Sequence, residues 1–344
     1  MNKNTGRTKY SNKVQWSYLK YTSLAIIFIF GLMTISETRR PKKPKIMSIQ
    51  VVAANVWQQG DEESDADVAE RLYKSGKLIG DKFGFWSFIA ANELAGDLTG
   101  WALTVRRWRA KALNCPYDES DEKLLSINCL EKGLRRMTDP NHLMHQKGEL
   151  GIIASNLYFE QLPVNEAGDL EYHKLIGPER TGGIQRRLIA SRFKSKTFNK
   201  NVLFVSTHLS HAGSPEERQE ELRDLIRNIK EIFTPGDLTP ILAGDFNCRS
   251  WKAGLRRIIY QDFMIVDEAG SIDNVFIGRP QSFPENGGVL LPKANSVVRL
   301  RPYYQGTKLS DHEYFSAVVE YDPDNQPTYL APPEIGTGEG CVKP

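Results

Sequence analysis

Short apolar runs, many of them rich in β-branched residues, recur along residues 48–321 and alternate with longer polar stretches. Runs of this length, bounded by Gly, Asn, Asp and Ser, are typical of strands in sheets that are buried on at least one face. Each run carries polar residues of types that enzymes use for acid–base chemistry or metal binding. The runs are IQVVAANVW, FWSFIAANEL, NVLFVSTHLS, PILAGDFN, GSIDNVFIG and KLSDHEYFSAVVEY, and their polar residues include Asn55, Glu93, His208, Asp245, Asn247, Asp273, Asp311 and His312.

Helical patterns lie between the predicted strands, and the clearest of them begins at Ser214. Ser214 and Glu217 have the spacing of a capping box, and Pro215 suits the first helical position. An apolar face at helical spacing then continues to Phe233. Further helices are predicted near 66–80 and within 96–113 and 120–137.

The alternation of strands and helices predicts a single α/β domain over 48–321, because the chain has no internal repeat and no second linker. We interpret the long charged segment 94–147 as a helical insertion into this domain. Residues 322–344 are rich in Pro and Gly, and we expect them to form a tail.

One strongly apolar run, SLAIIFIFGLMTI at residues 23–35, precedes this domain. It is short for a membrane span and suits the apolar region of a signal peptide. A basic segment, 1–22, comes before it, and a basic linker rich in Pro and Lys, 36–47, follows it. We therefore expect export or membrane anchoring through 23–35. Cleavage stays open, because a basic flank is unusual directly after a cleaved signal peptide.

The basic character of the chain belongs to its N-terminus. Residues 1–46 carry a net charge of +9 and the remainder carries −6, which together make +3 for the whole chain. Charge alone therefore does not make the body of the protein a non-specific polyanion binder. Contact with nucleic acid would need a local basic groove or a metal ion.

The pairing of the four cysteines is open. Cys115 and Cys129 lie in one polar segment and would suit a disulfide in an exported domain, but buried free thiols explain them equally well. Cys248 and Cys341 have no evident partner, and no CxxC spacing indicates a zinc site.

Each polar residue at a strand end, taken alone, has a structural explanation as a turn cap, a surface charge or a core histidine. Their joint placement favours a shared site instead. The sequence has no GxSxG elbow for acyl transfer and no P-loop or GxGxxG for a nucleotide cofactor. Oxygen ligands without cysteine favour a hard cation such as Mg²⁺ or Mn²⁺. A hard cation, a histidine and a carboxylate base are the groups that phosphoester hydrolysis needs.

Seven motifs follow one another along residues 48–321: AANVW, FIAANEL, GELGIIASN, STHLS, LAGDFN, SIDNVF and LSDHEYF. In this order they resemble the endonuclease/exonuclease/phosphatase superfamily, which includes pancreatic deoxyribonuclease, abasic-site endonucleases, inositol-polyphosphate 5-phosphatases and neutral sphingomyelinases. The resemblance implies a four-layered α/β/β/α sandwich of two packed mixed sheets flanked by helices. It also implies an active site at one edge of the sheets. We expect the catalytic domain to be monomeric.

The resemblance assigns catalytic roles to five of the residues. His208 would stabilise charge on the phosphate or act as general acid. Asp245 would orient or deprotonate the attacking water, and Asn247 would bond a phosphate oxygen. Asp273 would pair with His312, fix its tautomer and keep it cationic near the phosphate.

The metal site is also implied by the resemblance. Glu93 would be the principal ligand of Mg²⁺ or Mn²⁺, with Asn55 as its neighbour, and Asp311 would assist the metal or the water network. The residue before the family's metal glutamate is usually glutamine, and here it is Asn92.

The substrate contacts depart from the family pattern. A basic residue often follows the GIIAS motif, and here the position is Asn156. Arg186 and Arg187 are the candidates to supply the missing phosphate contact, although solvated arginines at a strand edge explain them equally well.

The sequence favours nucleic acid over a lipid headgroup as the substrate. RLRPYYQGTK, residues 299–308, mixes basic and aromatic side chains as nucleic-acid contacts often do. The main alternative is a phosphoinositide phosphatase or a sphingomyelinase, because STHLSHAG resembles the 5-phosphatases and an N-terminal anchor would place the enzyme beside lipid. A non-catalytic binding module of the same fold is a third hypothesis.

Overall fold

The structure is a computed structural model. It describes residues 46–56, 65–83, 86–94, 111–113, 125–134, 142–178, 186–210, 214–247, 253–267 and 272–332. The apolar run 23–35 and three of the cysteines, Cys115, Cys248 and Cys341, lie outside these ranges. Among the described residues, no helix combines the length and apolar character needed to cross a membrane. Export or anchoring through 23–35 therefore stays a prediction, which fractionation of cells expressing the full-length chain would check.

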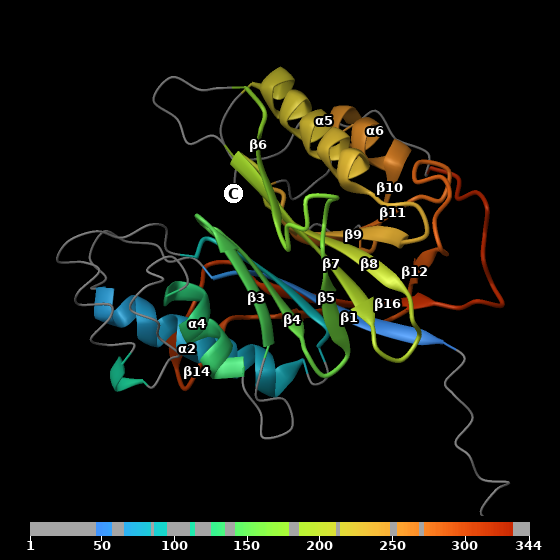
Figure 1. The fold of residues 1–344 in the computed structure, drawn as a ribbon. Coiled ribbons are helices and arrows are strands. Elements are labelled where there is room, and N and C mark those ends of the chain that lie inside the picture. The colour runs from blue at the N-terminus through green and yellow to red at the C-terminus, as the bar shows by residue number, and fades with distance from the viewer. Residues whose placement is uncertain are drawn as a thin grey trace, which may run out of the picture. The chain divides into compact units, whose positions relative to one another are not determined.

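Two mixed sheets pack face to face, and helices cover both outer faces (Figure 1). The predicted four-layered α/β/β/α sandwich is thus confirmed. The first sheet has the order β12 (Leu290–Pro292), β16 (Tyr314–Tyr321), β1 (Met47–Asn55), β2 (Phe88–Asn92), β4 (Leu150–Ser155) and β3 (His142–Lys147), with β13 (Val298–Leu300) also paired to β16. The second has the order β10 (Phe263–Ile265), β11 (Asp273–Gly278), β9 (Leu238–Asp245), β8 (Asn201–His208), β7 (Arg186–Ser195) and β5 (Phe159–Leu162), with β6 (Tyr172–Ile176) also paired to β7.

The central strands read as continuous apolar runs because both of their faces are buried. In β1, Val51 and Ala53 enter the core between the sheets, while Val52 and Ala54 enter the core beneath the helices. Phe88 of β2 packs its ring 4.8 Å from that of Phe204 in β8, which joins the two sheets through an aromatic pair.

Helices α2 (Asp65–Lys82) and α4 (Leu125–Leu134) cover the first sheet, and α5 (Pro215–Ile232) and α6 (Ala253–Asp262) cover the second. The capping box predicted at the start of α5 is confirmed. Ser214 Oγ accepts a hydrogen bond from the Glu217 backbone N–H at 3.2 Å, and the Glu217 carboxylate accepts one from the Ser214 backbone N–H at 2.8 Å. The helix predicted near 66–80 is confirmed as α2.

Parts of the segment 94–147 belong to the sandwich itself. β3 is the edge strand of the first sheet, and α4 packs closely on α2. The helix predicted within 120–137 is confirmed as α4, whereas the interpretation of the segment as helical is wrong for 142–147, which form β3. Within the rest of the segment, the structure describes only 111–113 after Leu94. β3 was not predicted as a strand because its sequence, HLMHQK, is only partly buried and has little apolar character. Its pairing with β4 is what makes it a strand.

A short hairpin and the start of the C-terminal segment lie outside the two sheets. A short hairpin, β14 (Tyr303–Tyr304) with β15 (Thr307–Lys308), precedes the SDH motif. The start of the predicted tail packs on the domain, because the buried Arg279 donates hydrogen bonds to the carbonyl oxygens of Leu330 at 2.6 Å and Ala331 at 3.0 Å.

Candidate active site

The polar residues at the strand ends meet at one edge of the two sheets because of the way the strands pair. β1 and β2 run parallel and end side by side at Asn55 and Asn92, and β8 and β9 run parallel and end at His208 and Asp245. β11 runs antiparallel to β9 and begins at this edge, with Asp273 opposite Asp245. Residues far apart in the sequence therefore come into contact.

The parallel strands β8 and β9 approach each other closely just before they reach this edge. Gly244 has a φ of 143°, and a Cβ atom there would lie 2.0 Å from the carbonyl oxygen of Thr207. Only glycine tolerates both the dihedral angle and the lack of space. Gly244 thus allows His208 and Asp245 to lie side by side.

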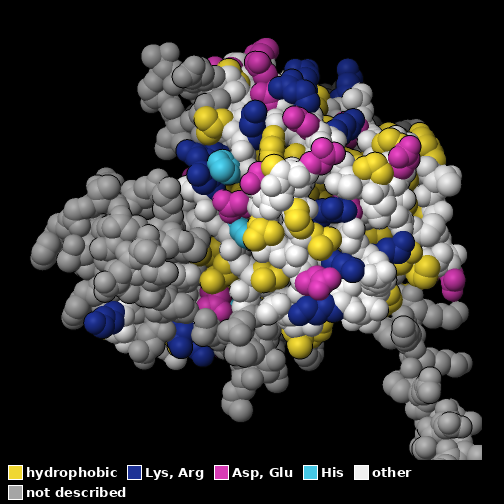
Figure 2. All heavy atoms as spheres, in the orientation of Figure 1, with side chains coloured by type: hydrophobic (Ala, Val, Ile, Leu, Met, Phe, Trp, Pro, Cys, Tyr) yellow, Lys and Arg dark blue, Asp and Glu magenta, His cyan; other side chains and the backbone are white. Residues whose placement is uncertain are grey.

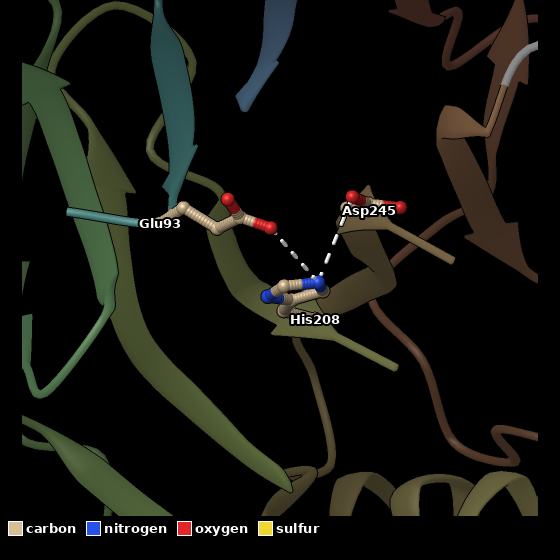
Figure 3. Close-up of side chains that lie close together, drawn as sticks. All are labelled: Glu93, His208 and Asp245. Carbon is tan, nitrogen blue, oxygen red and sulfur yellow. Dashed lines mark ion pairs between the residues drawn. The ribbon is translucent and has the colours of Figure 1, made fainter. Parts of the chain in front are cut away.

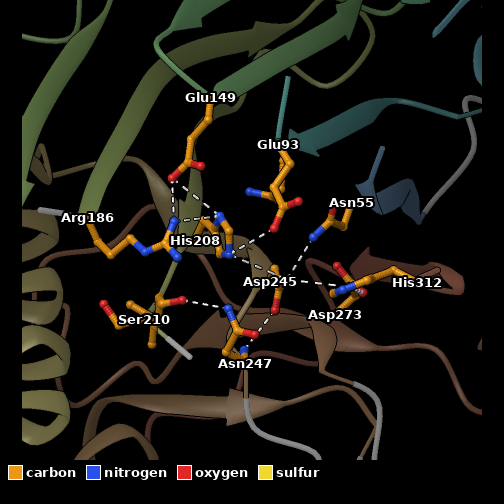
Figure 4. A network of polar contacts seen from close by, with 12 residues as sticks. Asn55, Glu93, Glu149, Arg186, His208, Ser210, Asp245, Asn247, Asp273 and His312 are labelled. Carbon is orange, nitrogen blue, oxygen red and sulfur yellow. Dashed lines mark hydrogen bonds and ion pairs between the residues drawn. The ribbon is translucent and has the colours of Figure 1, made fainter. Parts of the chain in front are cut away.

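Asp245 lies at the centre of the site and has 0% of its surface exposed. Its Oδ2 accepts a hydrogen bond from Asn55 Nδ2 at 2.9 Å, and its Oδ1 accepts one from the Asn247 backbone N–H at 2.8 Å. Two imidazoles approach the same Oδ2, with His208 Nε2 at 3.6 Å and His312 Nδ1 at 3.5 Å (Figure 4). Burial of a carboxylate is costly unless it is paired, and these donors offset that cost.

Glu93 follows β2 directly and points from the first sheet toward His208 (Figure 3). Its backbone has a φ of 55°, a conformation that non-glycine residues adopt at a cost. Its Oε1 lies 3.4 Å from His208 Nε2, and its side chain is 19% exposed. Burial raises the pKa of Glu93, and the charge of His208 and a hydrogen bond from Asn55 offset this only in part. A nearby cation would stabilise this carboxylate.

The other ring nitrogen of His208 faces Glu149 and Arg186 (Figure 4). His208 Nδ1 lies 3.3 Å from Glu149 Oε1, and Arg186 Nη1 donates a 2.8 Å hydrogen bond to the same oxygen. Burial by itself would lower the pKa of His208, but the hydrogen bond to Glu149 and the charge of Asp245 raise it. Burial by itself would raise the pKa of Glu149, but His208 and Arg186 lower it to about 2.

Glu149 is a site residue to which we assigned no role from the sequence. It stands in GELGIIASN directly before β4, so an acidic residue next to an apolar run was the available signal. Arg186, which we predicted to contact substrate, is buried against Glu149 and His208.

His312 forms a second histidine–carboxylate pair on the far side of Asp245. Its Nδ1 lies 3.0 Å from Asp273 Oδ2. Burial by itself would lower the pKa of His312, but the hydrogen bond and charge of Asp273 raise it to about 9. Ser310 holds the loop in place, because its Oγ donates to the Asn55 carbonyl oxygen at 2.8 Å and accepts from the His312 backbone N–H at 3.1 Å.

Asn247 lies at the lower rim of this network in Figure 4. Its Nδ2 donates a 2.7 Å hydrogen bond to the Leu209 carbonyl oxygen, and Arg218 donates a 2.8 Å hydrogen bond to the carbonyl oxygen of Asn247. The structure thus places Asn247 beside Asp245 and commits one amide hydrogen to the backbone.

One of the predicted site residues lies apart from this cluster, and another lies at its exposed rim. Asn156 follows the far end of β4, because Ala154 pairs with Phe88 at the start of β2, and Lys196 donates hydrogen bonds to its carbonyl and side-chain oxygens. The structure therefore does not bring Asn156 to the site. Asp311 is exposed, with its Oδ1 3.9 Å from His312 Nε2.

Two groups of side chains in the described part of the chain bring possible metal ligands within 4.8 Å of one another. One is Glu93 with His208 and Asp245, and the other is Asp245 with Asp273 and His312. Neither includes Asp311, whose part in metal binding or the water network stays a prediction. Asp273 and His312 already pair with each other, which leaves Glu93 as the partly exposed carboxylate of the first group. Its oxygens and those of the neighbouring Asn55 and Asp245 are the donor type that Mg²⁺ and Mn²⁺ prefer.

Charges of both signs are interspersed over the face seen in Figure 2, where the described residues form no broad region of one sign. This agrees with the modest negative charge outside the N-terminal segment. Any positive potential at the site is therefore local.

No protein-family model matches the sequence, and no curated protein matches it. Solved structures do resemble it in fold. An endonuclease/exonuclease/phosphatase from Bacteroides vulgatus is 17% identical, with 80% of this chain and 99% of the other covered and a TM-score of 0.55. An endonuclease/exonuclease/phosphatase family protein from Bacteroides thetaiotaomicron is 14% identical, with 83% and 99% covered and a TM-score of 0.55. A mannosyl-6-phosphatase from Bacteroides thetaiotaomicron VPI-5482 is 14% identical, with 79% and 99% covered and a TM-score of 0.51.

Proposed function

Because this chain has the fold of the endonuclease/exonuclease/phosphatase proteins, we propose that it is a metal-dependent phosphoesterase. The observation that carries the proposal is the surroundings of Asp245. A buried carboxylate lies between two histidines, each of which has its own carboxylate partner, and a fourth carboxylate, Glu93, stands beside His208. Water activation and charge stabilisation on a phosphoryl group require these parts at one place.

Glu93, together with the side chains of Asn55 and Asp245, would hold a divalent cation. Such a cation, when bound, supplies positive charge that stabilises the phosphoryl oxygens and the leaving oxygen. The oxygen-rich donor set and the raised pKa of the Glu93 carboxyl support this assignment.

In the proposed reaction, Asp245 accepts a proton from the attacking water. Glu149 and Arg186 hold the Nδ1 side of His208, so its Nε2 faces the reaction centre. Asp273 holds Nδ1 of His312 in the same way and keeps that ring cationic. Donors that are held in advance toward developing charge typically contribute about 10²–10³-fold each to such reactions.

We propose a phosphodiester of the nucleic-acid backbone as the substrate. The stretch 299–308 supports this, because Arg301 has an 85% exposed side chain and Tyr303 is 53% exposed just before the SDH motif. An exposed aromatic ring and a guanidinium offer stacking and phosphate contacts to a nucleic-acid strand. DNA and RNA satisfy these contacts equally.

The test is hydrolysis by the full-length protein with Mg²⁺, with Mn²⁺ and with EDTA. The substrates are plasmid DNA, RNA, inositol phosphates, sphingomyelin and, because one structural neighbour is a mannosyl-6-phosphatase, mannose 6-phosphate. We expect nicking of DNA or cleavage of RNA with metal and none with EDTA.

Two other outcomes would revise the proposal. Hydrolysis of an inositol phosphate, of sphingomyelin or of mannose 6-phosphate without cleavage of nucleic acid would replace the substrate but keep the enzyme. No turnover of any substrate with metal present would overturn the phosphoesterase function and favour a binding module.

A further inference from the structure

Basic side chains also line the space between the sheets beside the catalytic residues, at the edge where β3 of the first sheet faces β6 and β7 of the second. We call His145, Lys147, His173 and Arg187 the flanking strip. Lys147 ends β3 only two residues before Glu149, and Arg187 pairs with His208 across β7 and β8.

Strand register places the side chains of the flanking strip on the inner faces of the two sheets. Residues opposite each other on antiparallel strands project to the same face. Lys147 pairs with Leu150, His145 with Ile152 and His173 with Ile189, and all three partners belong to the core between the sheets. Arg187 lies two residues before Ile189 on β7 and so shares its face.

The flanking strip carries more positive than negative charge, because Glu171 pairs with His145 at 3.1 Å and, within the described ranges, leaves two cations of the strip without an ion pair. Among the described residues, neither Lys147 nor Arg187 makes an ion pair, whereas Arg186, Arg192 and Arg299 each pair with a carboxylate. Burial and then the charge of Lys147 lower the pKa of His173, the charge of Glu171 raises it, and the charge of Arg187 lowers it further.

The Arg187 side chain extends across the turn that joins β3 to Glu149, the residue that positions His208. Gly148, with a φ of 56°, forms this turn, and a Cβ atom there would lie 3.6 Å from Arg187 Nε. The guanidinium therefore packs against the backbone next to Glu149. The neighbouring Leu175, which pairs with Arg187 on the same face, is 46% exposed and adds an apolar contact.

We infer that the flanking strip binds a second phosphate of the substrate, next to the phosphate that is hydrolysed, and that the substrate is an oligonucleotide strand. The inference rests on the proposed function and extends it. Unpaired basic side chains suit a polyanion. The exposed Leu175 favours an oligonucleotide over an inositol phosphate, because the sugars and bases of an oligonucleotide offer apolar surface and an inositol phosphate does not.

The first test is binding of a fluorescein-labelled oligonucleotide of about ten nucleotides, a length that a single-strand groove holds, measured by anisotropy on the full-length protein in EDTA. We expect the Lys147→Gln/Arg187→Gln double variant to weaken binding at least tenfold. In a plot of log K for binding against the logarithm of the salt concentration, the slope for the double variant should be shallower than the wild-type slope by about 1.4. This is the value for two phosphate contacts on a single strand. The matched control is Lys194→Gln, at the other end of β7 and paired with Glu160, which should bind like the wild type. Equal weakening by the control, or no weakening by the double variant, would overturn the inference.

The second test compares kcat/KM for the oligonucleotide with kcat/KM for bis(p-nitrophenyl) phosphate, which has one phosphate. We expect the ratio to fall about tenfold in the double variant, as the binding loss predicts. An equal loss on both substrates would mean that the residues act at the hydrolysed phosphate, and would overturn a second subsite. Displacement of the oligonucleotide by inositol hexakisphosphate at equal phosphate concentration would overturn the assignment of an oligonucleotide as the ligand of the flanking strip.

Different results would overturn the phosphoesterase function and phosphate binding by the flanking strip. Charge-dependent binding without hydrolysis in any metal would overturn the proposed function and support the flanking strip. Hydrolysis of the oligonucleotide with binding unchanged in the double variant would overturn the flanking strip alone.

Discussion

Asp245 combines full burial with a negative charge, and the site is organised to keep that charge. The amide of Asn55 and the backbone of Asn247 each donate to one carboxylate oxygen. Its charge in turn raises the pKa values of His208 and His312, so both rings are favoured as cations. In the proposed reaction, the carboxylate would therefore act both as a proton acceptor and as the counter-ion of the two histidines.

At the residue scale, we predict that Asp245→Asn lowers kcat/KM by about 10²–10⁴-fold, because it removes the general base. The melting temperature should change by no more than about 5 °C, since the amide has the same shape and relieves repulsion with Asp273. The measurement is steady-state kinetics with differential scanning calorimetry. Asp262→Asn, which loses only the ion pair to Lys230, is the control and should keep its activity. Loss of folding in Asp245→Asn would show a structural role instead.

At the element scale, the site depends on how closely the parallel strands β8 and β9 approach. Thr207 pairs with Gly244, and His208 with Asp245, one step further along the register. A second contact ties the sheets together at the same edge, because Asn92 Nδ2 of β2 donates a 2.8 Å hydrogen bond to the Thr207 carbonyl oxygen. The strand ends that carry Glu93 and His208 are thereby held at a fixed separation.

We predict that Gly244→Ala destabilises the fold by about 2–5 kcal/mol, because the new Cβ collides with Thr207 and the dihedral angle disfavours any side chain. Urea denaturation would measure the change. Gly168→Ala is the matched control, since its φ is also positive at 87° but nothing lies within 4 Å of the new Cβ. It should cost only about 1–2 kcal/mol. Equal losses in the two variants would contradict the close approach of β8 and β9.

At the scale of the whole molecule, charged pairs at this edge link stability to pH. An unfolded histidine titrates near pH 6.5, whereas the pKa of His312 in the fold is raised to about 9. The folded protein therefore binds this proton more tightly. Its contribution to stability is complete below pH 6.5 and disappears as the pH rises through 9. Burial and the charge of Asp245 raise the pKa of Asp273, which acts in the same direction at lower pH.

We predict that the free energy of unfolding falls on the order of 1–3 kcal/mol as the pH rises from about 6.5 to about 9. Urea denaturation in EDTA across this range would measure it. His312→Asn should show a smaller fall over the same range. His173→Asn, at an exposed position, is the control and should keep the wild-type fall. A flat wild-type profile would rule out the raised pKa of His312.

Much of the fold and part of the site follow from local patterns in the sequence. The apolar runs identify β1, β2, β8, β9, β11 and β16, and the capping box identifies the start of α5. Polar residues directly beside these runs, such as Asn55 and Asp245, were recognisable as site candidates because a strand end presents its last side chains to one edge of a sheet. The weakly apolar β3 lacked such a signal and was recognised only through its pairing with β4.

The sequence by itself determined which residue types stand at the strand ends, because a buried strand must be apolar and can therefore be located from its sequence alone. Only the tertiary structure decided which of them meet. It brought Glu149 to His208, placed Asn156 at the far end of β4, and turned Arg186 inward to Glu149. These outcomes depend on the order and register of strands that are distant in the sequence. Pairing between such strands produces no periodic pattern in the local sequence.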